Sequence, residues 1–212
     1  RWLKMSFKKN KYVIIKQAID KNLALFLYNY FHMKRQVLDT CRNARYISPY
    51  ETLLGEYEGA NSQIPHTYSN YSDIAMETLM LKCQPIMEKT TGLKLYPSYT
   101  YARIYKKGDQ LKRHKDRFSC EISTTMNLGG DKWSIYLEPS GELNKKGIKV
   151  DLSSGDMLVY SGCELEHWRE KFKGKISAQV FLHYNNTKTK FAKENMFDKR
   201  KHLGLPSWFK SR

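Results

Sequence analysis

Residues 99–116 read YTYARIYKKGDQLKRHKD and combine a strand pattern, a turn and a His-x-Asp pair in one short segment. Larger side chains at 99, 101, 103 and 105 alternate with smaller ones, and this period of two residues is typical of a β-strand. Lys107-Gly108-Asp109 then predicts a turn. His114 and Asp116 follow two residues apart, so on a strand both side chains would project to the same face.

The same pattern of short β-prone runs and turns continues downstream. β-prone runs alternate with glycine-containing turns as far as residue 184. Many short strands separated by turn residues predict a sandwich or a barrel. The expected strands are 122–128, 133–137, 149–152, 157–160 and 176–184, with turns at 129–131 and 155–156.

The N-terminal part is expected to hold one strand and two helices. Residues 12–19 are β-prone, and Asp20 has the residue type that caps a helix N-terminus, which predicts a helix from there to about Leu38. A second helix is expected to start at about Asp73, with Gly92 as its stop signal. Two helices in this position would cover one outer face of the strand core.

A long loop separates the two expected helices and completes the domain plan. Residues 44–72 are rich in Tyr, Ser, Pro, Gly and Asn, and loops of that length are usually functional or mobile. A chain of 212 residues is long enough for one domain with a sizeable core, whereas two would be cramped. We expect a single domain with a helical and loop part at about 1–92, a strand core at about 93–184 and a basic extension at 185–212.

The net charge of +16 is large for this length. Such a charge attracts polyanions and acidic partners through long-range fields, so a nucleic acid or an acidic partner is one interpretation. The other is a solvated surface, which we expect for the terminal runs and for the tail segment Lys199-Arg200-Lys201.

Neither a membrane nor a secretory route is indicated. No segment approaches the ~20 apolar residues of a membrane span, and no leader with a cleavage site is evident. The cysteines lack a Cys-x-x-Cys pair, so we expect a cytoplasmic protein with reduced, buried thiols. These cysteines are Cys41, Cys83, Cys120 and Cys163.

The residues with the clearest chemical potential are His114, Asp116 and His167. Two neutral imidazoles and one carboxylate suit Fe(II) and leave coordination positions open. The fold would have to bring His167 alongside the first pair from a distant strand. A His-x-Asp pair alone is weak evidence because it also arises by chance. Zinc accepts the same donors, but a zinc site would leave the basic residues downstream of His167 without a role.

The wider pattern resembles that of the prolyl 4-hydroxylase-like oxygenases. Tyr, Gly and His-x-Asp occur at 105, 108 and 114–116 in that family's order. The run GDMLVY at 155–160 resembles the strand that precedes the family's distal histidine, and KISAQVFLH at 175–183 resembles its last core strand. The resemblance spans about residues 99–184. It implies a mainly β protein with flanking helices, folded as a double-stranded β-helix, a cupin-like jelly roll with the metal at its mouth.

The resemblance also implies an Fe(II)- and 2-oxoglutarate-dependent dioxygenase with His114, Asp116 and His167 as its catalytic metal ligands. Lys175 would hold the distal carboxylate of 2-oxoglutarate, because it opens the last strand and can point into the barrel. Tyr105 and Asn127 would add hydrogen bonds to this cosubstrate. The interval from His167 to Lys175 is short for the family, so three other basic residues remain alternatives, namely Arg169, Lys171 and Lys173.

Substrate contacts are expected at Arg103, Arg117 and Trp168, with structural salt bridges as the other interpretation of the two arginines. His183, at the end of the last strand, is expected to be a structural hydrogen bonder. Dioxygen would be the second cosubstrate, and succinate and CO2 would be released. The loop 44–72 would act as a lid.

The resemblance favours hydroxylation of a peptidyl residue such as proline. Two other substrates remain open, a nucleic acid and a small molecule such as an amino acid. The nucleic-acid alternative is weakened because residues 176–184 contain no arginine. A jelly-roll binding module without catalysis is a further alternative, although an intact ligand set argues against it.

Overall fold

The structure, a computed structural model, describes residues 7–57 and 64–210. These residues form three α-helices, ten β-strands and three short 3₁₀ turns. The helices are α1 (Phe7–Asn10), α2 (Lys21–Asn43) and α3 (Ile74–Thr91), and the 3₁₀ turns are η1 (Phe118–Cys120), η2 (Met196–Lys199) and η3 (Ser207–Phe209). The strands are β1 (Tyr12–Ile15), β2 (Ser69–Tyr71), β3 (Leu95–Lys106), β4 (Leu111–His114), β5 (Ile122–Gly130), β6 (Ile135–Leu137), β7 (Ile148–Val150), β8 (Met157–Ser161), β9 (His167–Arg169) and β10 (Ile176–Asn186).

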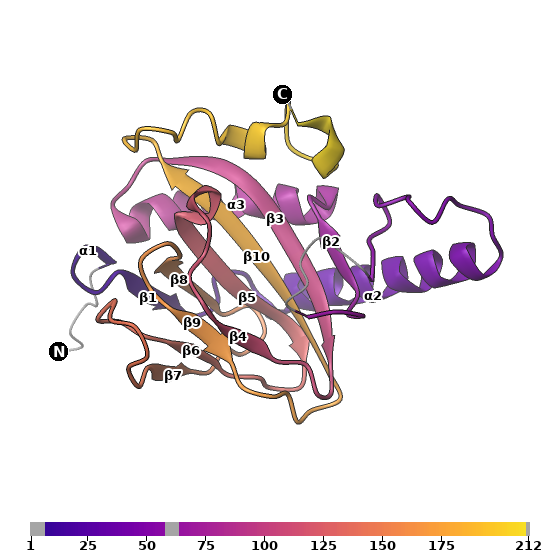
Figure 1. Cartoon of the computed structure of the whole chain (residues 1–212), viewed down its shortest axis with the longest axis horizontal. Helices are drawn as coiled ribbons and strands as arrows, with labels where there is room; N and C mark the ends of the chain where they lie inside the picture. The colour runs from indigo at the N-terminus through magenta and orange to yellow at the C-terminus, as the bar shows by residue number, and fades with distance from the viewer. Residues whose placement is uncertain (1–6, 58–63, 211–212) are drawn as a thin grey trace.

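The strands form two antiparallel sheets (Figure 1). The larger sheet has the order β1-β8-β5-β10-β3-β2, and the smaller has the order β4-β9-β6-β7. From β3 to β10 the chain passes back and forth between the two sheets, which is the winding of a double-stranded β-helix. The predicted jelly roll is therefore confirmed.

The helix boundaries follow local capping signals. The Asp20 carboxylate accepts a hydrogen bond of 2.9 Å from the Leu23 N–H and starts α2. Asp73 does the same for α3, with 3.0 Å to the Met76 N–H. Gly92 then adopts a left-handed conformation with φ of 73°, which ends α3. These predicted boundaries are confirmed, and α2 continues beyond its expected end to Asn43.

Both long helices pack on the outer face of the larger sheet, α3 against β3 and α2 against β5 (Figure 1). Ala102 and Ile104 of β3 belong to this hydrophobic core and are buried there. Because successive residues of a strand point to opposite faces, burial of these two turns Arg103 and Tyr105 toward the space between the sheets. Hydrophobic packing on one face thus orients polar groups on the other.

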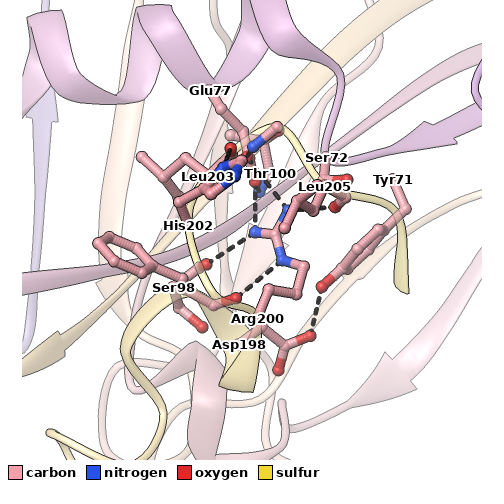
Figure 2. Close-up of polar contacts among 12 residues, drawn as sticks. Tyr71, Ser72, Glu77, Ser98, Thr100, Asp198, Arg200, His202, Leu203 and Leu205 are labelled. Atoms are coloured by element: carbon pink, nitrogen blue, oxygen red, sulfur yellow. Dashed lines mark hydrogen bonds and ion pairs between the residues drawn. The ribbon is translucent and has the colours of Figure 1, made fainter. Parts of the chain in front are cut away.

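The C-terminal segment packs on the core, against our expectation of a solvated tail (Figure 2). The Arg200 guanidinium is buried and forms an ion pair of 2.7 Å with Glu77 of α3. Asp198 is buried too, and its carboxylate accepts a hydrogen bond of 2.6 Å from the Tyr71 hydroxyl. The prediction was wrong for Arg200 because the sequence around it does not reveal an acidic partner on a distant helix. Lys199 and Lys201, its neighbours, are exposed as expected.

The structure also bears on the expectations about membrane spans, the cysteines and the loop 44–72. Within residues 7–57 and 64–210, no helix is long and apolar enough to cross a membrane. The four cysteines are free thiols, of which Cys83 and Cys120 are buried and Cys41 and Cys163 are partly buried. The described part of the loop 44–72 is irregular apart from the short β2, and residues 58–63 lie outside the described residues.

Candidate metal centre

The structure brings His114, Asp116 and His167 together between the two sheets. His114 on β4 and His167 on β9 are register partners of adjacent strands, and Asp116 follows two residues after His114. The Asp116 Oδ1 atom lies 3.6 Å from Nε2 of His114 and 3.3 Å from Nε2 of His167. Two ligand atoms bound at right angles to one metal ion, each at about 2.1 Å, lie about 3 Å apart. The spacing therefore suits adjacent positions around a single ion.

Hydrogen bonds fix the orientation of both imidazoles. Nδ1 of His114 lies 2.7 Å from the Lys112 carbonyl, and Nδ1 of His167 lies 3.1 Å from the Leu165 carbonyl. A carbonyl oxygen can only accept, so each Nδ1 carries the proton and donates it. The unprotonated Nε2 atoms then face Asp116 and are available to a metal ion.

The Asp116 carboxylate is held in place and ionised. Burial alone raises the pKa of the Asp116 carboxyl. When no metal is bound, the adjacent His167 and His114 imidazoles in their protonated form outweigh burial and keep that pKa well below the ordinary value. The Ser123 hydroxyl lies 2.9 Å from Oδ2, so the second oxygen is oriented as well. A side chain at Gly162 would place its Cβ 2.5 Å from the same oxygen, which explains a glycine at this point.

A second group of potential ligands shares Asp116. Cys120 and His183 are buried beside it, and the ligand atoms of these three residues also lie within 4.8 Å of one another. Burial raises the pKa of the Cys120 thiol to about 12, which disfavours the thiolate that metals bind. The Ser123 hydroxyl contacts both Asp116 Oδ2, at 2.9 Å, and Nδ1 of His183, at 3.0 Å, so two potential ligand atoms of this group already have a hydrogen-bond partner within the chain. The donor set with two imidazoles is therefore the better metal site.

A cavity of about 530 Å³ opens onto the three ligands. Its walls carry the inward-facing residues of β3, including Arg103 and Tyr105, and the C-terminal residues Ser207 and Lys210. His183 also lines it, in addition to the predicted hydrogen bonding. A cavity of this size falls in the range of small-ligand sites.

The structure does not place Lys175 in this cavity. Its side chain is exposed just before β10, and its backbone N–H donates to Asp131 Oδ2 at 2.6 Å. Lys171 and Lys173 are exposed as well. Arg169, by contrast, is only 1% exposed. It stands two residues after His167 on β9, and two residues along a strand bring a side chain back to the same face. The basic residue that points into the barrel is therefore Arg169.

The Arg169 guanidinium has polar neighbours but no counter-charge in the described residues. Nη2 donates to Thr125 Oγ1 at 3.1 Å and to Gln179 Oε1 at 3.4 Å, and Nη1 donates to the Trp133 carbonyl. The Nε–H has no partner. Burial lowers the pKa of Arg169 to about 10, so the group stays charged at neutral pH. A buried charge is costly unless a charge of opposite sign accompanies it.

Arg103 and Arg117 both line the cavity, but they differ in burial and in ion pairing. Arg103 is 3% exposed, and its guanidinium lies 5.1 Å from the centre of the Tyr101 ring. Arg117 lies at the surface and pairs with Asp198 at 3.2 Å. The salt-bridge interpretation thus applies to Arg117, while Arg103 has no ion-pair partner among residues 7–57 and 64–210.

Two expected site residues lie elsewhere. The Asn127 amide donates to the Leu152 carbonyl at 2.9 Å, and Asn127 lines a separate hollow beside α2. Trp168 faces the opposite side of β9 from His167, where it stacks on Tyr136 with ring centroids 5.5 Å apart. Neither residue lines the cavity at the metal ligands. Alternation along β9 accounts for Trp168, because adjacent residues point to opposite faces.

Sequence reasoning did not identify Ser123 or Thr125 as parts of the site. Both lie on β5, where residues 123 and 125 share one face, as the period of two residues would have indicated. Their neighbours were not predictable, since Ser123 contacts Asp116 from another sheet and Thr125 contacts Arg169.

The strand order defines a class of fold, the double-stranded β-helix. No family model and no curated protein sequence matches the chain. Solved structures do match it. A prolyl-4-hydroxylase from Pseudomonas putida has a TM-score of 0.62 at 13% identity, covering 85% of this chain and 95% of its own.

Two further solved structures have the same fold. HygX from Streptomyces hygroscopicus, solved with nickel and 2-oxoglutarate bound, has a TM-score of 0.56 at 12% identity, covering 86% of this chain and 85% of its own. The α-ketoglutarate-dependent carbocyclase SnoK from nogalamycin biosynthesis has a TM-score of 0.60 at 10% identity, covering 94% of this chain and 90% of its own. At these identities the likeness establishes the fold, and the chemistry must be argued from the site.

Proposed function

We propose that the chain is an Fe(II)- and 2-oxoglutarate-dependent dioxygenase that hydroxylates a C–H bond. One observation carries the proposal: the Nε2 atoms of His114 and His167 lie 3.6 and 3.3 Å from the same Asp116 oxygen. This is the donor set that suits Fe(II) and leaves open coordination positions.

The three ligands would hold the metal at the cavity and leave its other positions to 2-oxoglutarate and dioxygen. When bound, the iron and its two cosubstrates supply the oxidising power, and 2-oxoglutarate leaves as succinate and CO2. The chain holds the ligands rigidly, through the Lys112 and Leu165 carbonyls, and shelters the site from water. Tyr160, which is buried and lines the cavity beside His167, contributes to that shelter.

For the distal carboxylate of 2-oxoglutarate we propose Arg169 in place of Lys175. Its Nε–H is buried and has no partner, and its guanidinium lacks a counter-charge in the described part of the chain. A planar guanidinium can bind a carboxylate through two parallel hydrogen bonds, which are strong when sheltered from water. Thr125, which already contacts Arg169 at 3.1 Å, and the nearby Tyr105 hydroxyl would complete the pocket.

A peptidyl residue such as proline is the first candidate substrate. The likeness to a prolyl-4-hydroxylase supports it. Glu56 of the loop 44–72 and Tyr71 of β2 line the cavity, which supports a lid role for the described part of this loop. A nucleic acid or an acidic partner remains a hypothesis that rests on the net charge of +16.

A small molecule is the second candidate substrate. The cavity of about 530 Å³ would accommodate one. Lys210 and Ser207 of the C-terminal segment contribute to its wall, which narrows the space left for an extended peptide. The likeness to the carbocyclase SnoK agrees with this candidate.

The test is succinate release that depends on both Fe(II) and 2-oxoglutarate. The wild-type protein should convert 2-oxoglutarate slowly without substrate and faster with the correct one. Proline-containing peptides, single-stranded oligonucleotides and free amino acids form the screening panel. Asp116→Ala should abolish turnover, and a control at an exposed position, Asp151→Asn, should retain it. Turnover that survives Asp116→Ala, or wild-type protein that releases no succinate with any panel member, would contradict the proposal.

A further inference from the structure

We propose that Arg103 binds a carboxylate of the substrate, so that the molecule oxidised at this site is acidic. The inference rests on the proposed function and deepens it by naming the chemistry that the substrate must carry. Arg103 stands on β3 with its side chain directed into the cavity that also holds the three metal ligands.

The Arg103 guanidinium is buried, and its hydrogen bonds are only partly satisfied. Arg103 is buried, its Nη2 donates to the Tyr101 hydroxyl at 3.1 Å, and its Nε–H has no partner. A phenol satisfies one hydrogen bond, and the Glu56 and Asp109 carboxylates interact with Arg103 only through space, without forming an ion pair with it. A buried charge without an ion-pair partner is unfavourable for folding, so its presence on a cavity wall indicates an anion that arrives from outside.

The other cations that line the cavity either have an ion-pair partner or are exposed to solvent. Arg117 and Lys210 both pair with Asp198, at 3.2 and 2.7 Å. Lys115 is exposed to solvent. The Glu56 carboxylate also lines the cavity, but it makes no ion pair with Arg103 in the described contacts. Among the described lining residues, Arg103 is therefore the buried cation that has no ion-pair partner.

The Arg103 guanidinium adjoins the proposed cosubstrate pocket but has different hydrogen-bond partners from Arg169. Tyr105 lies near both guanidinium groups, and Gln179, which contacts Arg169, is the register partner of Arg103. The partners of Arg169 are on β5, on β10 and in the turn before β6. Arg103 instead contacts Tyr101, whose hydroxyl donates to Ser69 on β2 at the edge of the larger sheet. Two buried guanidinium groups with different hydrogen-bond partners call for two carboxylates. 2-Oxoglutarate would supply one to Arg169, and the second would come from the substrate.

The Arg103 guanidinium is held in position before any ligand binds. The Arg103 guanidinium lies 5.1 Å from the Tyr101 ring centre and 5.8 Å from that of Tyr105, so aromatic faces hold it on both sides. A cation fixed in this way loses little freedom when it binds a carboxylate. The site is thus built before the substrate arrives.

The experiment follows the arginine side chains directly by NMR. Protein labelled with ¹⁵N-arginine is loaded with Zn(II), a diamagnetic stand-in for Fe(II), and saturated with 2-oxoglutarate. Arg103→Met and Arg169→Met assign the two buried Nε–H signals. The probes are matched pairs: propionate against propionamide, and acetyl-Gly-Asp-Gly-amide against acetyl-Gly-Asn-Gly-amide. Lys201→Met is the control, because it removes an exposed cation that does not line the cavity.

We expect the carboxylate of at least one pair to move the Arg103 signal saturably, with at least tenfold tighter binding than its amide. Arg103→Met should weaken that binding at least tenfold, and Lys201→Met should not. Binding of propionate alone would identify a free organic acid, and binding of the aspartyl peptide alone an acidic peptide. If Arg103→Met does not fold, Arg103→Lys replaces it, and the single ammonium should bind the carboxylate more weakly than wild type.

The inference is overturned if carboxylate and amide behave alike in both pairs, or if carboxylate binding survives the loss of Arg103. Failure of the proposed function gives a different result. In that case 2-oxoglutarate would leave the Arg169 signal unmoved, while the Arg103 signal could still respond to a carboxylate.

Discussion

Replacing Arg200 by methionine should destabilise the protein strongly. Nη2 of Arg200 lies 2.7 Å from Oε1 of Glu77, and Nη1 lies 3.2 Å from Oε2 (Figure 2). The two side chains are 0% and 2% exposed, so the substitution would leave a carboxylate buried without its counter-charge. Breaking a buried pair from one side costs about 3–5 kcal/mol. Domains of this kind have about 5–15 kcal/mol in total, so a large share of the stability would be lost.

The same pair anchors the C-terminal segment. Glu77 also accepts a hydrogen bond from the Gly204 N–H, and Arg200 donates to the Leu205 carbonyl at 2.6 Å. Loss of Arg200 would therefore release the segment that contributes Lys210 to the cavity wall. Functional damage is expected to accompany the loss of stability, although Arg200 itself does not line the cavity.

Urea unfolding followed by circular dichroism measures the effect. Lys201→Met, at the exposed neighbouring position, is the matched control and should change the free energy of unfolding by less than about 0.5 kcal/mol. The double variant Glu77→Gln with Arg200→Met removes both charges and should recover part of the loss. A cost below about 1 kcal/mol for Arg200→Met would refute the reasoning, since it would mean that water reaches the Glu77 carboxylate.

Three further predictions concern the site and the pH dependence. His167→Ala should abolish Fe(II) binding in an anaerobic equilibrium titration, because it removes one of three protein ligands. Arg169→Met should weaken 2-oxoglutarate binding about 10- to 100-fold in calorimetry, the range of a hydrogen bond to a charged group, whereas Lys175→Met should leave it within about twofold. Asp156→Asn should cost about 1–3 kcal/mol of unfolding free energy at pH 7, and less at pH 3. Burial alone raises the pKa of Asp156, but hydrogen bonds from Lys16 and from backbone N–H groups outweigh it and hold the pKa below its ordinary value. Its stabilising effect is therefore present above the unfolded pKa and lost as pH falls.

Each of these has a control and a contradicting result. His202→Ala, at an exposed position, should bind Fe(II) normally, and retained binding in His167→Ala would remove that residue from the site. Loss of 2-oxoglutarate affinity in Lys175→Met but not in Arg169→Met would restore the sequence-based expectation. Asp151→Asn, on an exposed carboxylate, should show no such pH dependence. An Asp156→Asn penalty that grows on acidification would contradict the assigned pKa direction.

Local signals allowed much of the fold to be predicted. The caps Asp20 and Asp73 and the stop at Gly92 act within a few residues, so their effect can be read from the chain alone. The period of two residues predicted β3, and β-prone runs predicted most other strands, whereas the short β2, β4 and β9 were not predicted. The pairing of His114 with His167 across β4 and β9 is not local, and it was predicted only through the order of motifs in a known family.

The predictions were wrong where the role of a residue depends on the direction of its side chain or on a partner that is distant in the sequence. Lys175 was preferred because it opens a strand, yet Arg169 shares the face of His167 on β9, a short strand that the sequence analysis did not predict. The Asn127 amide donates to the Leu152 carbonyl, and the residues next to Asn127 in the sequence do not predict this contact. Arg200 looked like part of a solvated charge run because Glu77 precedes it by 123 positions.

The central claim is that His114, Asp116 and His167 together bind one ferrous ion beside 2-oxoglutarate. A crystal grown anaerobically with Fe(II) and 2-oxoglutarate, with data collected at the iron absorption edge, tests it directly. We predict a single anomalous peak bonded to the two Nε2 atoms and to Asp116, with the distal carboxylate of 2-oxoglutarate on Arg169. A peak between Asp116, Cys120 and His183, or an imidazole of His167 that does not bind the ion, would contradict the claim.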